Sequence, residues 1–291
     1  MSLLRAYSFR LHGAEKVAAG LLFLQAVAPA RAADVSSWDS GPHSAVRLIA
    51  ADTQKEAGTP VLRAGIELKL ASGWKTYWRY PGDSGLPPRF DFTRSENVKD
   101  VVIKWPAPRR FTDEGDVTIG YKGEVTFPLI VVPKDADKPT VLRLDLDYAI
   151  CEKLCVPAKG QAELVLGADA AAHGPMLAAA EARVPAPTTV GDHATFAITS
   201  IRREAGAKEP RIVVDVAVQD GATHVDLFAE GPTPDWALPV PEPIAGAPPG
   251  VKRFGFALAG LPPGANAQGA RLKLTAVADE RAIEVEWRVS E

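Results

Sequence analysis

Cysteine and methionine are scarce in this sequence, which has two of each among 291 residues. It also lacks a run of basic residues, and its aromatic residues are not interleaved with lysine and arginine. A nucleic-acid-binding surface is therefore not expected. The histidines are scattered without short-range pairing. We expect no cofactor.

Long apolar runs are absent after the first 32 residues. Arg5, Arg10 and Lys16 precede an apolar stretch at 17–28, and Ala30-Arg-Ala32 has the pattern of a signal-peptide cleavage site. The apolar stretch is too short for a permanent membrane span. We therefore expect residues 1–32 to be a cleaved signal peptide, and the mature chain to be exported without stable membrane insertion. In an oxidising compartment, two thiols do not stay reduced without a source of electrons.

The two cysteines, Cys151 and Cys155, are four positions apart. An alternating segment at 142–148 leads into them, and a second apolar segment at 162–166 follows Pro157 and Gly160. This arrangement predicts a β-hairpin with the cysteines at or near its turn, able to face each other.

Three interpretations fit such a pair: a structural disulfide, a redox-active dithiol, or a Cu(I) site made by two thiolates. A crosslink that closes about 5 residues stabilises a fold by only about 2 kcal/mol, and a chain of this length can bury a sizeable core without it. Strained or exposed disulfides are the reducible ones. Soft thiolates suit Cu(I), but Met176 is the only methionine beyond the predicted signal peptide.

Alternation of apolar and polar residues at a period of two recurs along the first half and predicts β-strands. These segments lie at residues 45–49, 62–70, 75–80, 98–105, 124–132 and 141–148. Turns rich in proline and glycine separate them. The pattern predicts an all-β fold, an antiparallel sandwich of the immunoglobulin-like type over residues 35–168.

The pattern changes after the cysteine hairpin. Pro175 precedes an alanine-rich stretch and Pro185 follows it, which predicts a short helix at 175–183 and a linker, together covering 169–190. Six further strand-like segments predict a second sandwich over residues 191–291. They lie at residues 195–201, 211–218, 224–229, 252–258, 271–276 and 283–289.

Two local motifs are best interpreted as turns. Gly82-Asp-Ser-Gly85 is similar to the nucleophile segment of some serine proteases, but no histidine segment supplies the required base. Asp113, Glu114 and Asp116 surround a glycine and predict a solvated turn. Trp74, Tyr77, Trp78, Tyr80 and Trp105 gather in the half with the cysteines, either as sandwich core or as a pocket around the sulfurs.

Five motifs in one order carry a resemblance to a known family. They are Gly73-Trp-Lys-Thr-Tyr-Trp78, Pro81-Gly-Asp-Ser-Gly-Leu86, Trp105-Pro106, Tyr121-Lys-Gly-Glu-Val-Thr-Phe-Pro-Leu129 and Tyr148-Ala-Ile-Cys-Glu-Lys-Leu-Cys-Val-Pro157. The segment from about residue 40 to 168 resembles the periplasmic N-terminal domain of the DsbD-type thiol:disulfide interchange proteins. It is most similar to the branch that includes the ScsB proteins, linked to copper tolerance.

The resemblance assigns roles to particular residues. Cys151 and Cys155 match the family's redox pair, and Tyr77 and the loop at 112–118 match the tyrosine and the cap loop beside it. The loop, which includes Asp113 and Glu114, lacks the aromatic residue with which the family's cap covers the disulfide. Phe111 beside it could substitute.

The resemblance implies a periplasmic protein of the protein-disulfide reductase type, which carries reducing equivalents through Cys151 and Cys155. No transmembrane electron carrier or thioredoxin-like domain follows in this sequence. We therefore expect a separate membrane thiol reductase as electron donor, and thioredoxin-fold periplasmic proteins as clients. The alternatives are a Cu(I)-binding module that uses the same two cysteines and a structural sandwich with an inert disulfide.

Overall fold

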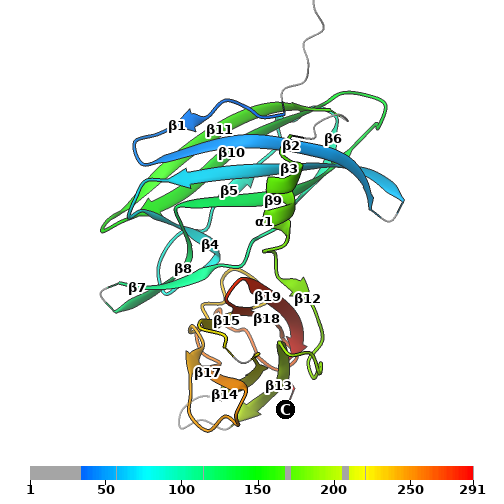
Figure 1. Ribbon diagram of the computed structural model, residues 1–291. Coiled ribbons are helices and arrows are strands. Elements are labelled where there is room, and N and C mark those ends of the chain that lie inside the picture. The colour runs from blue at the N-terminus through cyan, green and yellow to red at the C-terminus, as the bar shows by residue number, and fades with distance from the viewer. Residues whose placement is uncertain are drawn as a thin grey trace, which may run out of the picture. The chain divides into compact units, whose positions relative to one another are not determined.

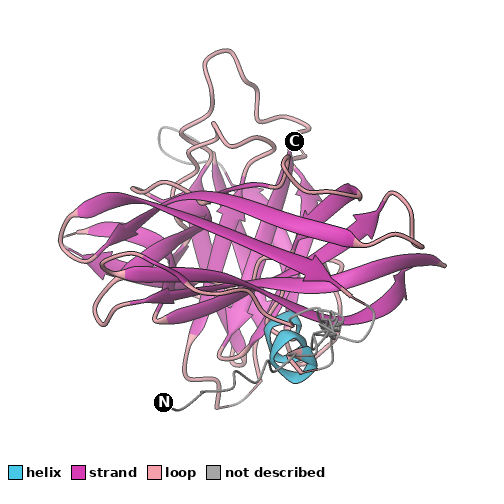
Figure 2. Ribbon diagram, turned by 90° about the horizontal axis from the view of Figure 1, so that it is seen from above, coloured by secondary structure: helices cyan, strands magenta, loops and turns pink. Residues whose placement is uncertain are grey.

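The computed structural model describes residues 34–56, 58–113, 115–167, 172–204, 210–219 and 221–290. The expected signal peptide and Glu114 lie outside them. Strands dominate the described chain, and a single helix is found in it (Figure 2). The strands form two β-sandwiches of antiparallel character joined by the helix, as the sequence predicts (Figure 1).

The first sandwich consists of two sheets. One has the order β1-β2-β3-β9-β6, and its strands are β1 (Asp39–Ser40), β2 (Ser44–Glu56), β3 (Thr59–Leu70), β9 (Glu124–Pro133) and β6 (Val98–Ile103). The other has the order β11-β10-β4-β8-β7, and its strands are β11 (Cys155–Leu166), β10 (Thr140–Cys151), β4 (Lys75–Gly82), β8 (Asp116–Lys122) and β7 (Arg109–Asp113). A short strand, β5 (Arg89–Asp91), also pairs with β10.

Alternating side chains build the core of this sandwich. On β10, Leu142, Leu144 and Leu146 are buried, while the residues between them are partly exposed. The Phe127 ring on β9 packs nearly perpendicular to the rings of Trp105 and Tyr121. This packing confirms the strands predicted from the two-residue period.

The sequence missed β7 and β8, which flank the turn predicted at Asp113 and Asp116. These two residues do face each other at the tip, so a turn is present, but it closes a hairpin. β8 is buried from Thr118 to Tyr121 and shows no alternation. Gly120 is required in β8, because a Cβ atom there would lie 1.9 Å from the carbonyl oxygen of Thr76.

β11 also begins earlier than expected, at Cys155 instead of near residue 162. Pro157 lies within it, opposite Ala149. β11 is the edge strand of its sheet, and an edge strand tolerates a proline because one side has no partner.

The helix α1 (Gly174–Glu181) begins one residue before Pro175, close to the predicted position. It packs on β9 and β2, where Leu177 is fully buried. Arg63 on β3 forms a bidentate ion pair with Glu181 at the end of α1. The helix is therefore attached to the first sandwich.

The second sandwich also has two sheets. One has the order β12-β19-β18-β15, with β12 (Ala186–Pro187), β19 (Arg281–Arg288), β18 (Arg271–Ala278) and β15 (Val225–Glu230). The other has the order β13-β14-β17-β16, with β13 (Ala197–Glu204), β14 (Arg211–Ala217), β17 (Val251–Ala257) and β16 (Glu242–Pro243). Residues expected in the linker form β12, which pairs in parallel with β19.

Candidate functional site

The two cysteines face each other at the end of the β10–β11 hairpin. Cys151 is the last residue of β10, Cys155 is the first residue of β11, and the two are paired in register. Both are free thiols, and their sulfur atoms lie 2.8 Å apart. The hairpin predicted from the sequence is confirmed, and oxidation to a disulfide requires little movement of the backbone.

The environments of the two sulfurs differ. Cys151 is 8% exposed and packs with Tyr77 and Ala149, whereas Cys155 is exposed. Burial, and to a smaller extent the hydrogen bond from Cys155, raise the pKa of the Cys151 thiol, while Tyr77 and Lys75 oppose the rise. Cys155 is therefore the more accessible sulfur, and Cys151 loses its proton less readily than a free thiol does.

Tyr77 extends the contact to the exposed sulfur. Its side chain is 1% exposed, and its hydroxyl oxygen lies 2.9 Å from Cys155 Sγ. Burial, followed by the contacts with the two cysteines, raises the pKa of Tyr77 far above its ordinary value. The phenol thus keeps its proton and can donate it in a hydrogen bond to a Cys155 thiolate.

The Gly82–Gly85 turn lies directly on the Tyr77 ring. A Cβ atom at Gly85 would lie 2.3 Å from Cε1 of Tyr77, and Gly85 has a φ of 124°. Asp83 ties the turn to β8, because its backbone N–H donates to the Val117 carbonyl and its carboxylate accepts from the Val117 N–H. The sequence indicated a turn here, but not its contact with the site, since a turn motif does not reveal its neighbours.

Lys75 lies beside the cysteines on β4. It is paired in register with Cys151, is 4% exposed, and donates from Nζ to Thr118 Oγ1 at 2.7 Å. The Phe111 ring on β7 is centred 5.9 Å from Lys75 Nζ and 4.7 Å from Lys122 Nζ. Phe111 therefore contacts the lysine beside the cysteine pair.

The remaining residues of the predicted cap lie at the tip of the β7–β8 hairpin. Asp113 ends β7, and its backbone pairs with Asp116. Glu114 lies outside the described residues. A role for Asp113 and Glu114 in covering the sulfurs stays a prediction.

A known protein family matches the part of the chain that contains these residues. Residues 45–167 match the family described as thiol:disulfide interchange protein DsbD, N-terminal. Over these residues the chain is similar to a DsbD N-terminal domain. The resemblance expected from the five motifs is confirmed, and Tyr77, Cys151 and Cys155 all lie inside the matched DsbD segment.

A solved structure extends the similarity beyond the DsbD segment. The fold is similar to the crystal structure of the N-terminal periplasmic domain of ScsB from Proteus mirabilis, with a TM-score of 0.67 and 22% identity. The match covers 89% of this chain and 99% of the ScsB domain, so both sandwiches have counterparts. At this identity the likeness establishes the fold alone. Comparison with curated proteins gave no match.

The arrangement suits exchange of electrons between sulfur atoms. An exposed sulfur lies next to a buried one, and a phenol contacts the exposed sulfur. Within the described residues, no three histidine, cysteine or acidic side chains are grouped to hold a metal ion. The helix found there is also too short to cross a bilayer.

Proposed function

We propose that this chain is a periplasmic thiol–disulfide exchange protein, which carries reducing equivalents from a membrane thiol reductase to oxidised client proteins. The observation that carries the proposal is the asymmetric pair, an exposed Cys155 with its sulfur 2.8 Å from that of a buried Cys151. The DsbD match over residues 45–167 supports the same chemistry.

The chain accepts electrons in two displacement steps. A thiolate of the reductase attacks Cys155 Sγ of the disulfide, the S–S bond breaks, and Cys151 leaves as a thiolate that takes up a proton. A second thiolate of the reductase then attacks the reductase sulfur in the mixed disulfide. Cys155 is released, and the reductase is left oxidised. Two electrons and two protons have then passed to this chain.

The client reaction runs in the opposite sense. The Cys155 thiolate, stabilised by the Tyr77 hydroxyl, attacks a client disulfide, and one client sulfur leaves as a thiolate. Cys151 then gives up its proton and attacks Cys155 Sγ, and the second client sulfur leaves as a thiolate that takes up a proton. Because its pKa is raised and its side chain is buried, Cys151 attacks disulfides in solution less readily than Cys155 does before the mixed disulfide has formed.

Two exposed apolar residues next to Cys155 support a protein as the partner. Leu154 is 78% exposed and Val156 is 38% exposed, on either side of Cys155 in sequence. Exposed apolar residues beside a reactive group are typical of a protein docking surface. We expect thioredoxin-fold periplasmic proteins to dock here.

Trapping of the mixed disulfide tests the proposal. Cys151→Ser leaves the exposed thiol without its resolving partner, so it should accumulate a mixed disulfide with a thioredoxin-fold protein of the periplasm. Cys155→Ser leaves only the buried thiol and should accumulate little. The absence of any mixed disulfide with Cys151→Ser would refute the proposed function.

Copper binding, the alternative inferred from the sequence, calls for a separate measurement. Anaerobic titration of the reduced chain with Cu(I) should show weak binding that a mild chelator reverses. Tight binding that Cys151→Ser abolishes would favour the copper site instead.

A further inference from the structure

The stretch of β4 that follows Tyr77 has few partners in its own sheet. β4 pairs with β8 from Lys75 to Tyr77 and again only at Gly82, and it pairs with β10 only at Lys75 and Thr76. The four residues between Tyr77 and Gly82 therefore require other contacts to hold their position.

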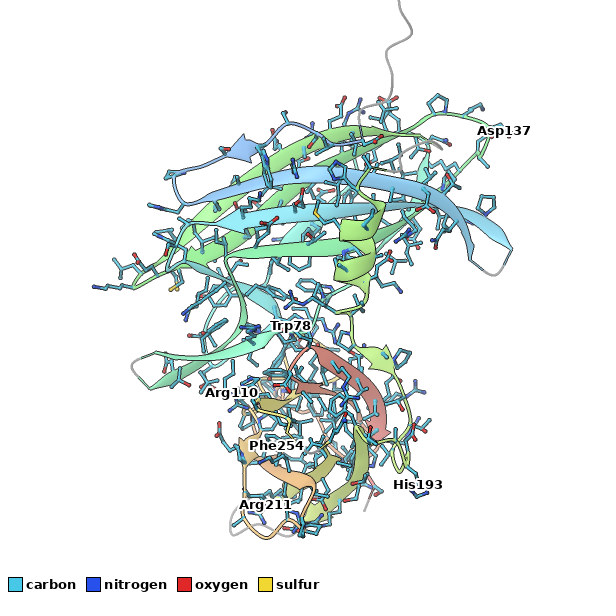
Figure 3. The ribbon with its side chains drawn as sticks, viewed as in Figure 1. Trp78, Arg110, Asp137, His193, Arg211 and Phe254 are labelled. Carbon is cyan, nitrogen blue, oxygen red and sulfur yellow. The ribbon has the colours of Figure 1, made fainter. Side chains whose placement is uncertain are left out.

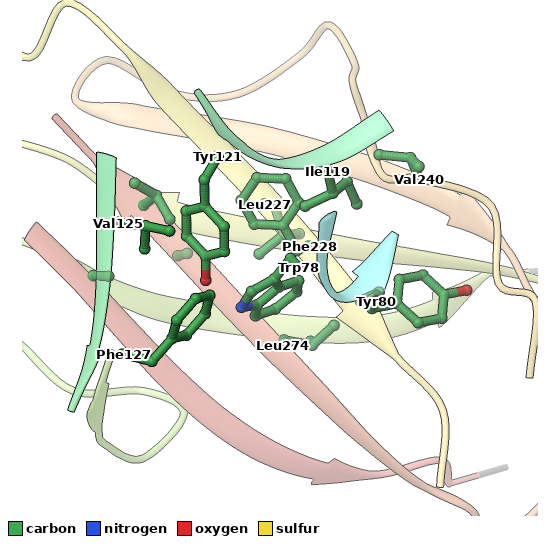
Figure 4. Packing of buried hydrophobic residues seen from close by; sticks show 14 of the residues in the cluster. Trp78, Tyr80, Ile119, Tyr121, Val125, Phe127, Leu227, Phe228, Val240 and Leu274 are labelled. Atoms are coloured by element: carbon green, nitrogen blue, oxygen red, sulfur yellow. The ribbon is translucent and has the colours of Figure 1, made fainter. Parts of the chain in front are cut away.

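The second sandwich supplies these contacts. The Trp78 and Phe228 rings are centred 5.7 Å apart, and Figure 4 shows Trp78 within the apolar packing that includes Phe228. Arg79 donates two hydrogen bonds to Glu230, at 2.7 and 2.8 Å, and also pairs with Glu284. The Tyr80 hydroxyl donates to the Leu238 carbonyl at 2.8 Å.

A second arginine anchors β7, the strand on the other side of β8. Arg110 forms a bidentate pair with Asp226 and also donates to Glu242 and to the Pro241 carbonyl. Asp226 is 4% exposed, so the pair lies largely out of solvent. Trp78 and Arg110 are labelled in Figure 3.

We propose that the second sandwich positions the redox site, with Arg79 and Arg110 as positioning residues: Arg79 holds Tyr77 beside Cys155, and Arg110 holds Phe111 beside Lys75, the neighbour of Cys151. This inference rests on the proposed function of Cys155. Arg79 is two residues from Tyr77, and Arg110 is next to Phe111. Loss of Arg79 removes the ion pairs that hold the unpaired stretch of β4 next to Tyr77, so the Tyr77 hydroxyl shifts relative to Cys155. Loss of Arg110 removes the ion pair next to Phe111, so the Phe111 ring shifts relative to Lys75.

A double-mutant cycle on the full chain tests the role of Arg79. The reduced Arg79→Met variant should be alkylated by iodoacetamide at Cys155 about tenfold more slowly at neutral pH, the loss expected when a charge-assisted hydrogen bond is disrupted. In a Tyr77→Phe background, Arg79→Met should have little further effect, because the hydrogen bond is already absent. If Arg79 only stabilised the fold, Arg79→Met would slow alkylation of Cys155 by the same factor in the wild-type and in the Tyr77→Phe background.

The role of Arg110 is tested by replacing both members of its ion pair with Asp226. Arg110→Met with Asp226→Leu removes both charges and leaves no buried carboxylate unpaired. The double variant should fold and should show a shift of about tenfold in its equilibrium with glutathione, which corresponds to about 30 mV. An unchanged equilibrium would overturn the assignment of Arg110.

Controls separate this inference from general destabilisation and from the proposed function. Arg253→Met breaks a comparable ion pair with Asp215 inside the second sandwich and should leave Cys155 reactivity unchanged. If Arg79→Met does not fold, the milder variant Glu230→Gln replaces it. Glu230→Gln weakens the same ion pair and is also expected to slow alkylation of Cys155. Alkylation requires no protein partner, so its result stands even if no mixed disulfide is trapped. Unaltered alkylation in both Arg79→Met and Glu230→Gln would overturn the proposal.

Discussion

The hydroxyl oxygen of Tyr77 lies 2.9 Å from the sulfur of Cys155, although the two residues are 78 positions apart in the chain. Cys155 in turn donates to Cys151 Sγ. The three side chains form one hydrogen-bonded row, from a buried phenol through an exposed thiol to a buried thiol. The row places the two chemically identical cysteines in different environments.

Removal of the Tyr77 hydroxyl should slow the alkylation of the exposed Cys155 thiol. Tyr77→Phe loses the hydrogen bond that stabilises a Cys155 thiolate, so alkylation at neutral pH should fall about tenfold. Timed iodoacetamide labelling with mass spectrometry measures it. Tyr148→Phe is the matched control, because its hydroxyl contacts Ser44 Oγ instead of sulfur. Equal rates in wild type and Tyr77→Phe would contradict the role of the phenol.

The charge of Lys75 should act on the buried thiol. Lys75 opposes the rise in the pKa of Cys151, so Lys75→Met should raise that pKa further. Labelling of Cys151 across a pH series, with Cys155→Ser as background, should then move to higher pH. Lys75→Arg retains the charge and should shift labelling less. An unchanged labelling profile in Lys75→Met would show that the charge of Lys75 does not act on Cys151.

The turn on Tyr77 should be sensitive to one added methyl group. Gly85→Ala combines an unfavourable φ with a clash against the Tyr77 ring, so it should cost about 1–3 kcal/mol of stability and also slow Cys155. Gly191→Ala provides the control, since Gly191 has a φ of 85° and open space around it. It should lose stability without a change at Cys155. Denaturant unfolding and labelling of both variants decide this.

The pH dependence of the free energy of unfolding in alkaline solution should report the ionisation of Tyr80. Burial raises the pKa of Tyr80 to about 12, above the value of about 10 for an unfolded tyrosine. The unfolded state therefore loses its proton first, and the free energy of unfolding should fall as the pH rises from about 10 towards 12. Tyr80→Phe should weaken this fall. Unfolding curves in urea at several pH values measure it, and an identical slope in the variant would exclude Tyr80 as its source.

Local patterns determined much of the fold. The two-residue period marks β9 and β10, because one face of each packs into a core while the other is more exposed. The same rule fails for β8, which is buried on both faces. It also gave no warning that the linker would supply β12, since a two-residue pairing leaves no periodic signal.

The sequence by itself determined that the two cysteines would meet at a hairpin. They are four positions apart and a strand flanks each of them, so the local chain path alone brings them close together. Only the tertiary structure decided which sulfur is exposed, which phenol contacts it, and which arginines reach the second sandwich. Those features depend on side chains far apart in sequence, such as Arg79 and Glu230, and local patterns do not encode such contacts.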